Sequence, residues 1–501
     1  MASSPETNTP DKHTPSGTPD NTPGKPGKPF LIIGTAVIIL ATLSLVPWGS
    51  LTGGFFKNFN LLDDISDVKV ADSEDNTADA EAIDPLLVQA EKEANDAQKA
   101  VAAGALVPDS LLKPAQQPRV NGRMIIEDYS VNGKGLERFK AALEKRGTRT
   151  VRVGVIGDSY IEGDIYTSAM REILQQKYSG RGVGYVAPTN LVSGFRPTIT
   201  QRDNGFTDYD LRKDSNPDCA WLSGQRFTAD VGASVTWTAV NKEDYPHLNG
   251  WNTATILLRA PNGGVITTNT GAGPVDHKVS ASKGVQAIQL KGDMTKLTLT
   301  NKSVSGLTLY GAWLNDATGI TVDNMSLRGN SGITHRAIRK ELARDMARYI
   351  DYDLIVVEYG LNACTPKQTD YTYYSNMMTQ VIATLKEAYP NADIIMMGAG
   401  DRGLKHGSSV ASMSTVPYMV STQREVARKA GINFFDTREA MGGEGAILKW
   451  REEKLVNPDY IHMNFQGGKK MGKLFTDALL GTIGSTAAAP QGAKPAAEPA
   501  K

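Results

Sequence analysis

Apolar and polar residues follow two different periodicities along the chain, which indicates two kinds of structure. Leu136, Phe139 and Leu143 recur at helical spacing within residues 135–145, and residues 151–156 alternate as a buried strand does. After residue 331 the pattern alternates between predicted helices and strands, at 334–349, 354–357, 371–388, 394–397, 416–430, 432–435 and 467–480. Such alternation is typical of a parallel sheet covered by helices.

Residues 200–312 lack helical periodicity and contain short alternating runs separated by Gly, Asn and Thr clusters. The runs lie at 234–239, 254–260, 264–268, 285–290, 296–300 and 306–310. Closely spaced short strands predict a β-sandwich. We expect Trp237, Trp251 and Trp313 in the protein core rather than on an exposed platform for a ligand.

The strand over 151–156 ends in Gly157-Asp158-Ser159, and helix-like sequence follows from Tyr160 to about Tyr178. A serine at a strand-to-helix turn can expose its Oγ and aim a backbone N–H at the same point, which suits nucleophilic catalysis. Such a tripeptide is also common in ordinary turns. The interpretation therefore depends on partner residues elsewhere in the chain.

Three later segments carry residues of the required types. Residues 458–462 read Pro-Asp-Tyr-Ile-His and place Asp459 and His462 three residues apart, ahead of the final predicted helix. Asn362 follows a predicted buried strand, and Gly329 lies in a polar turn. Parallel sheets carry their active sites at the carboxyl ends of the strands, so Ser159 and Asn362 should meet at one edge.

This order of residues resembles the SGNH (GDSL-type) hydrolase superfamily, whose four blocks carry Ser, Gly, Asn, and Asp with His. The resemblance covers residues 122–482, with a large insertion between the first and second blocks. The third block departs from the family pattern Gly-x-Asn-Asp, because Ala363 replaces the final Asp.

The resemblance implies a role for each matched residue. Ser159 would be the nucleophile, and His462 its base, because imidazole titrates near neutral pH. Asp459 would fix the tautomer of His462. The backbone N–H groups of Ser159 and Gly329 and the side-chain amide of Asn362 would form the oxyanion hole.

The fold class that follows is α/β: a three-layer, flavodoxin-like parallel sheet with helices on both faces, plus an inserted β-sandwich domain. The arrangement resembles envelope SGNH esterases with an inserted sandwich, including peptidoglycan O-acetylesterases. The predicted segments are a disordered tail (1–28), a transmembrane anchor (29–48), a stalk (49–121), the first part of the hydrolase domain (122–199), the inserted domain (200–312), the second part of the hydrolase domain (313–482) and a disordered tail (483–501).

Other candidate sites are weaker. Glu162 and Asp164 stand two apart on a predicted helix and would not face each other, which argues against a glycosidase acid pair. None of the six histidines has the spacing of a zinc motif, and no cofactor is expected. Gly180–Gly184 is neither a phosphate-binding nor a dinucleotide-binding loop, and we interpret it as a sharp turn. It also competes with Gly329 for the second block.

The N-terminal region predicts a location at the membrane. Residues 29–48 carry no charge and have about the 20 residues that a spanning helix needs. Lys25 and Lys28 precede them, so the tail should stay in the cytoplasm. We expect a single-pass inner-membrane protein with a periplasmic catalytic domain. A cleaved signal peptide is the alternative, although no clear Ala-x-Ala site follows the apolar stretch.

Charge and cysteine content add two limits. The chain has 54 basic and 54 acidic residues, which argues against a nucleic-acid partner. Cys219 and Cys364 are its only cysteines. They could form one disulfide in an exported protein or remain separate thiols, because spacing alone cannot place them within bonding reach. Cys364 is not expected to be a nucleophile, since no separate histidine partner is evident.

The sequence thus predicts an extracytoplasmic serine esterase that removes O-acyl groups from an envelope or extracellular glycan such as peptidoglycan. The favoured acyl group is O-acetyl. Two alternatives remain open at this point. The same acyl-enzyme could transfer its acyl group to a glycan instead of to water. The protein could also be a non-catalytic glycan-binding protein with a decayed site.

Overall fold

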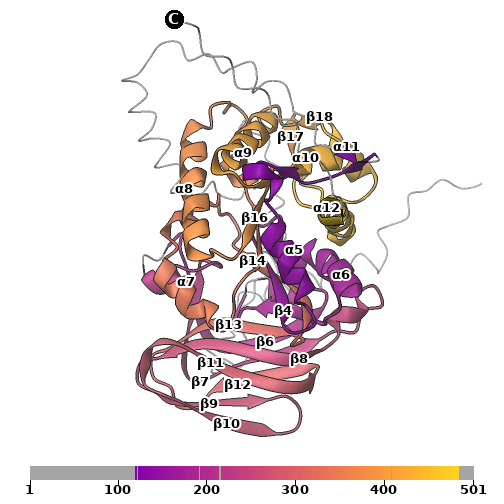
Figure 1. The fold of residues 1–501 in the computed structure, drawn as a ribbon. Coiled ribbons are helices and arrows are strands. Elements are labelled where there is room, and N and C mark those ends of the chain that lie inside the picture. The colour runs from indigo at the N-terminus through magenta and orange to yellow at the C-terminus, as the bar shows by residue number, and fades with distance from the viewer. Residues whose placement is uncertain (1–118, 121, 191, 214–215, 408, 485–501) are drawn as a thin grey trace, which may run out of the picture. The chain divides into compact units, whose positions relative to one another are not determined.

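The computed structural model describes residues 119–484, apart from 121, 191, 214–215 and 408. Part of it is a six-stranded sheet in the order β14-β4-β15-β16-β19-β3 (Figure 1). Neighbouring strands are parallel, except that short β3 runs antiparallel to β19. The strands are β3 (Glu127–Asp128), β4 (Thr150–Gly157), β14 (Gly319–Ser326), β15 (Leu354–Glu358), β16 (Asp393–Met397) and β19 (Asn433–Phe435).

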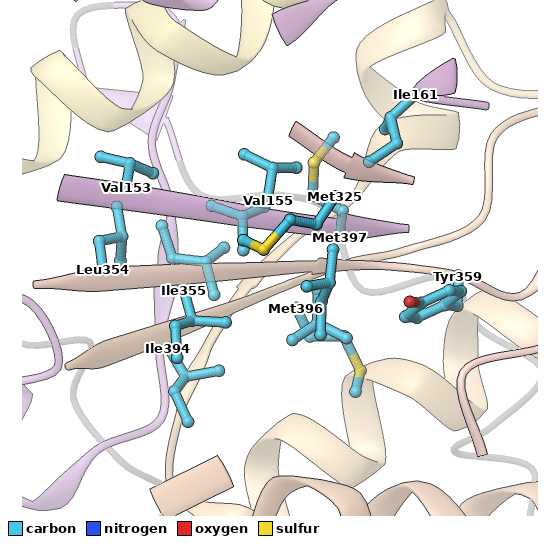
Figure 2. Close-up of a cluster of buried hydrophobic side chains, with 14 of the residues drawn as sticks. Val153, Val155, Ile161, Met325, Leu354, Ile355, Tyr359, Ile394, Met396 and Met397 are labelled. Carbon is cyan, nitrogen blue, oxygen red and sulfur yellow. The ribbon is translucent and has the colours of Figure 1, made fainter. Parts of the chain in front are cut away.

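These strands form because their apolar residues can be buried on both faces of the sheet. Figure 2 shows neighbouring strands packing together through side chains such as Val155, Ile355 and Met397. Met396 and Met397 are 1% and 0% exposed, which confirms that they belong to the core. Burying an apolar side chain of this size contributes about 1.5–3 kcal/mol.

Helices connect these strands, as the sequence predicts. They are α5 (Glu137–Glu144), α6 (Thr167–Tyr178), α7 (Lys340–Ala347), α8 (Thr372–Ala388), α9 (Val416–Ala430), α10 (Thr437–Met441), α11 (Ala446–Glu452) and α12 (Phe465–Gly484). Helix α12 packs against α6, and α8 packs against α7 and α9. The mixed α/β class and the mainly parallel sheet are confirmed, and the three-layer arrangement stays a prediction.

Short elements complete the described part of the chain. The 3₁₀ helices are η2 (Val131–Gly133), η3 (Glu162–Asp164), η4 (Ser193–Phe195), η5 (Pro217–Cys219), η6 (Pro246–Leu248), η7 (Ile333–Ala337) and η8 (Leu361–Ala363). Two small hairpins pair β1 (Arg119–Val120) with β2 (Arg123–Met124) and β17 (Gly403–His406) with β18 (Ser409–Ser412).

The helix predicted from Tyr160 is wrong before Thr167. The chain there turns and forms η3, and Gly163 and Asp164 have φ values of 64° and 65°. An α-helix requires negative φ at every residue, so α6 begins only after this turn. The helix predicted over 334–349 is also interrupted, because Ile338 and Arg339 are extended between η7 and α7.

A buried ion network holds the turn that contains Asp164. Arg171 donates to both oxygens of Asp164 at 2.6 and 3.0 Å, and Arg196 donates to the same carboxylate at 3.2 Å. The Arg171 Nε also donates to the Val322 carbonyl of β14 at 2.5 Å. The network therefore joins the turn after β4 to helix α6 and to strand β14.

The inserted domain is one antiparallel sheet of nine strands. Its main path is β10-β9-β12-β7-β13-β8-β11, with β5 paired to β13 and β6 paired to β7. The strands are β5 (Gly182–Val186), β6 (Ile199–Asp210), β7 (Gln225–Ala239), β8 (Trp251–Ala260), β9 (Gly264–Asn269), β10 (Pro274–Val279), β11 (Ser282–Met294), β12 (Lys296–Asn301) and β13 (Leu307–Asn315).

The predicted β-sandwich is therefore corrected to a single, continuously hydrogen-bonded sheet. Strand β7 pairs with β13 through residues 227–229 and with β12 through residues 234–238, while β6 follows β7 along both parts. The long strands β6 and β7 run through both parts and join them in one hydrogen-bonded ladder. Trp237 and Trp251 are buried in its core, as expected.

The interpretation of Gly180–Gly184 as a sharp turn is wrong, because Gly182–Val186 forms β5. Gly182 has a φ of 112°, and a Cβ there would lie 2.3 Å from the Leu314 carbonyl oxygen of β13. The glycine permits this close backbone approach. Glycine-rich sequence here marks a tightly packed strand.

Strand β13 is shared between the inserted domain and the α/β domain. All nine of its residues are buried. Leu309 and Leu314 belong to the core of the inserted sheet, whereas Tyr310 and Trp313 belong to the core of the α/β domain. The Trp313 indole N–H donates to the Tyr352 hydroxyl at 3.2 Å. The insertion is thus integrated into the α/β domain by shared packing.

The tail 1–28, the predicted anchor 29–48, nearly all of the stalk and nearly all of the C-terminal tail lie outside the described residues. Within residues 119–484, none of the described helices combines the length and apolar character needed to cross a membrane.

We expect Asp164→Asn to lower the free energy of unfolding by about 3–5 kcal/mol, because it leaves two buried arginines without a carboxylate. The amide keeps the shape of the side chain and its tolerance of positive φ. Urea denaturation followed by circular dichroism measures the change. Asp293→Asn is the matched control, since this carboxylate is 85% exposed in its pair with Arg181. Equal stability of both variants would contradict the role of the network.

The same network predicts a pH dependence. Burial alone would raise the pKa of Asp164, but Arg171 and Arg196 outweigh burial and hold the pKa well below its ordinary value. A lowered folded-state pKa stabilises the protein fully above the ordinary carboxyl pKa of 3.8 and less as the pH falls further. The wild type should therefore lose more stability below pH 3.8 than Asp164→Asn does, as urea denaturation at successive pH values would show.

Candidate active site

The segments that contain Ser159, Gly329 and Asn362 follow three neighbouring strands that end at the same level of the sheet. Strand β4 lies between β14 and β15, and Gly157 at its end is opposite Ser326 of β14 and Glu358 of β15. The chain continues from these ends to Ser159, Gly329 and Asn362. The carboxyl edge of a parallel sheet is where such proteins place their active sites.

Ser159, His462 and Asp459 form a continuous hydrogen-bonded chain. The Ser159 Oγ lies 3.0 Å from His462 Nε2, and His462 Nδ1 lies 2.8 Å from Asp459 Oδ2. Ser159 is 6% exposed, whereas the imidazole is 20% exposed. The connectivity is that of a serine, a base and an orienting carboxylate. The fold brings together residues that are 303 positions apart in sequence.

Local hydrogen bonds fix the Asp459-x-x-His462 turn. The Asp459 Oδ1 accepts from the backbone N–H groups of Ile461 and His462 at 2.8 and 3.1 Å. The turn is closed by a bond from the Asn457 N–H to the His462 carbonyl at 2.8 Å. Aspartate commonly bonds backbone groups two or three residues ahead in this way. The spacing of the motif therefore sets the position of the imidazole.

The environment keeps Asp459 ionised. Its partial burial would raise the pKa of the carboxyl group. The hydrogen bond from the His462 ring and those from two backbone N–H groups outweigh burial and lower the pKa below its ordinary value. A negative charge beside His462 stabilises the protonated imidazole that forms when the ring accepts a proton.

Asn362 lies beside the residue that precedes Ser159. It belongs to η8, is buried, and its Nδ2 donates to Asp158 Oδ2 at 2.9 Å and to the Asn330 carbonyl at 3.3 Å. The other oxygen of Asp158 accepts from the Tyr160 N–H at 2.8 Å. Asp158 therefore joins the serine turn to Asn362. The place of Asp158 in Gly-Asp-Ser is its signal in the sequence, and its contact with Asn362 appears only in the structure.

Gly329 lies in the turn after β14 with a φ of 72°, a left-handed conformation that glycine adopts without strain. The Leu327 N–H donates to the Gly157 carbonyl at 2.8 Å, and the Asn330 N–H donates to the Leu327 carbonyl at 3.2 Å. These bonds place the turn at the end of β4. The competing Gly180–Gly184 segment instead contacts earlier residues of β14 and the strand β13.

The remaining candidates have structural partners. Glu162 pairs with Arg328, so it does not form a catalytic pair with Asp164. His335 is fully buried, burial lowers its pKa to about 4, and its Nε2 lies 3.1 Å from the Leu222 carbonyl. Among the described residues, no group of three or more His, Cys, Asp or Glu is placed to hold a metal ion.

Comparison with known protein families agrees with this arrangement of residues. Residues 297–470 match the model of the GDSL-like lipase/acylhydrolase family. This part of the chain is a GDSL-like acylhydrolase domain. It contains Gly329, Asn362, Asp459 and His462, and Ser159 precedes it across the inserted domain. The protein is thus an SGNH-type carboxylic ester hydrolase, as the sequence analysis expected.

A solved structure shares the fold of this hydrolase. A structure described as a peptidoglycan O-acetylesterase in action has 21% identity and a TM-score of 0.58, and the match covers 72% of this chain and 99% of that one. A family two carbohydrate esterase from Cellvibrio japonicus has 14% identity and a TM-score of 0.26, over 60% and 98% of the two chains. At 21% identity, the similarity to the peptidoglycan O-acetylesterase structure shows a shared fold and nothing more. No curated protein sequence matches this chain.

The two cysteines provide a test of how well their side chains are buried. Cys219 and Cys364 are both buried and are not joined in a disulfide, and burial raises the pKa of Cys364 to about 12. A buried, protonated thiol is a poor nucleophile. We expect Ellman's reagent to react with neither thiol in the native protein at pH 8 and with both after denaturation. A fast-reacting thiol in the native protein would contradict the buried position of these side chains.

Proposed function

We propose that this protein removes O-acyl groups from an envelope glycan such as peptidoglycan through an acyl-enzyme on Ser159. The favoured acyl group is O-acetyl. The observation that carries the proposal is the hydrogen-bonded chain from Ser159 Oγ through His462 to Asp459. A serine hydroxyl becomes an effective nucleophile only when a neighbouring base accepts its proton.

In the first half of the reaction, His462 Nε2 accepts the proton of Ser159 Oγ as the oxygen attacks the ester carbonyl. The tetrahedral intermediate then collapses, and the glycan hydroxyl leaves with the proton from His462. In the second half, water gives a proton to His462 as its oxygen attacks the acyl-enzyme. The second tetrahedral intermediate collapses, His462 returns the proton to Ser159 Oγ, and the free acid leaves. Asp459 stays ionised throughout and balances the positive charge on the imidazole.

The oxyanion would receive hydrogen bonds from the backbone N–H groups of Ser159 and Gly329 and from Asn362 Nδ2. Asn362 Nδ2 already donates to Asp158 at 2.9 Å and to the Asn330 carbonyl at 3.3 Å. The longer bond is the weaker of the two, so we expect the oxyanion to replace Asn330 as its acceptor. Losing one such donor typically costs about 2.7–4 kcal/mol of barrier.

Three features support an acetylated envelope glycan as the substrate. The fold resembles that of the peptidoglycan O-acetylesterase structure. The inserted β-rich domain packs against the catalytic domain through β13 and could hold a polymer beside the serine. The uncharged stretch 29–48 favours a single-pass inner-membrane anchor with the catalytic domain in the periplasm. We also propose that helices cover both faces of the parallel sheet in three layers and that the domain boundaries are those predicted from the sequence.

Substitution of the serine and the histidine tests the chemistry. We expect Ser159→Ala and His462→Ala in the full-length protein to lower kcat for p-nitrophenyl acetate by about 1,000-fold or more, because each change removes an essential part of the nucleophile. Release of p-nitrophenolate measures the rate. Ser409→Ala and His406→Ala are matched controls on the exposed hairpin β17–β18. Full activity in Ser159→Ala would remove Ser159 as the nucleophile.

The substrate requires a separate test. We expect the protein to release acetate from O-acetylated peptidoglycan and none from the same polymer after alkaline de-acetylation, as measured by an enzymatic acetate assay. Ser159→Ala should release no acetate from either polymer. Hydrolysis of p-nitrophenyl acetate without acetate release from the glycan would count against this substrate. A gain of glycan acetyl groups from an added acetyl donor would instead support the transferase alternative.

A further inference from the structure

The connection between β6 and β7 reaches from the inserted domain to the catalytic domain. Trp221 and Leu222 in this connection are buried in the core of the α/β domain. His335 Nε2 lies 3.1 Å from the Leu222 carbonyl, and the Arg339 N–H donates to the Ala220 carbonyl at 2.9 Å. These contacts fasten the connection to the α/β domain.

Arg212, at the start of this connection, is held in a fixed orientation. Its Nε and one terminal nitrogen each donate to Asp210 at 3.0 Å, and its backbone N–H donates to the same carboxylate at 2.8 Å. The side chains of Arg212 and Asp210 are 19% and 5% exposed. A two-point pair of this kind fixes the plane of the guanidinium group.

The other terminal nitrogen of Arg212 donates to the Arg328 carbonyl oxygen. This carbonyl belongs to the same peptide group as the N–H of Gly329. Resonance couples the two ends of a peptide group, so a cationic donor on the oxygen makes the N–H more positive. Arg212 therefore acts on the Gly329 N–H. In the proposed function this N–H donates to the oxyanion.

The turn needs such a contact to keep its orientation. Gly329 is free to adopt many backbone conformations, and the Arg328–Gly329 peptide could rotate without moving its neighbours far. The Asn330 N–H closes the turn by donating to the Leu327 carbonyl at 3.2 Å, and the Leu327 N–H ties the turn to Gly157 of β4 at 2.8 Å. The bond from Arg212 acts on the carbonyl of the Arg328–Gly329 peptide, which lies between these two ties.

We infer that Arg212 of the inserted domain is a positioning residue for catalysis. It orients and polarises the Arg328–Gly329 peptide so that the Gly329 N–H points to the oxyanion. This inference rests on the proposed function. It gives the inserted domain a part in the chemical step that is separate from any binding of glycan.

The test compares Arg212→Ala and Arg212→Lys with the neighbouring exposed cation variant Lys213→Ala in the full-length protein. We expect Arg212→Ala to lower kcat for p-nitrophenyl acetate by about 10-fold to 100-fold with little change in KM, since an oxyanion donor acts mainly in the transition state. Arg212→Lys keeps one donor and should recover part of the loss. Lys213→Ala should match the wild type.

Hydrogen exchange of the segment around residues 326–331, measured by mass spectrometry, provides a readout that does not depend on turnover. It should become faster in Arg212→Ala and remain unchanged in Lys213→Ala, while exchange in β4 and β15 stays the same in both. Unchanged exchange in the turn would overturn the positioning role. Faster exchange throughout the protein would show general destabilisation and would also overturn it.

The kinetic outcomes separate this inference from the proposed function. Hydrolysis that requires Ser159 but keeps its wild-type kcat in Arg212→Ala would overturn the inference alone. Hydrolysis that persists in Ser159→Ala would overturn the proposed function. A loss in Arg212→Ala that appears entirely in KM would assign Arg212 to ground-state binding and would contradict its action on the oxyanion.

Discussion

The active site depends on the register of three parallel strands. Gly157 at the end of β4 lies opposite Ser326 of β14 and Glu358 of β15, so the three following turns begin at one level. A shift of one residue in either pairing would move a turn along the edge and reverse the direction of every side chain on the strand. Burial of apolar residues on both faces of the sheet keeps this register. The chemistry at the edge therefore depends on the hydrophobic core beneath it.

The inserted domain takes part in the same arrangement. Strand β13 is buried on both sides and contributes side chains to both cores. The connection between β6 and β7 places Trp221 in the α/β core and Arg212 against the turn of Gly329. Changes in the insertion can therefore alter the catalytic turn, even where no inserted residue touches substrate. Such a dependence distinguishes an integrated domain from one joined by a flexible linker.

Sequence reasoning failed where tertiary contacts overrode a local pattern. The helix predicted from Tyr160 begins late because Gly163 and Asp164 take positive φ, and the buried arginines that stabilise this turn come from α6 and from beyond β5. Gly182 resembles a turn residue, yet it serves a close strand contact. The short runs predict a sandwich because they cannot reveal that β7 is one long strand that pairs with both β13 and β12. Each of these errors concerns a partner that lies outside the short pattern used for the prediction.

The sequence by itself determined the alternation of strands and helices and the tryptophans of the core, and it indicated Ser159, Asn362, Asp459 and His462 as candidate site residues. Periodicity and short motifs are local properties, and the Asp459-x-x-His462 turn is built almost entirely from its own hydrogen bonds. Only the tertiary structure decided which glycine lies at the carboxyl edge and that Asp158 and Arg212 support the site. Those contacts join segments that are far apart in the chain, and their geometry depends on how the two cores pack together.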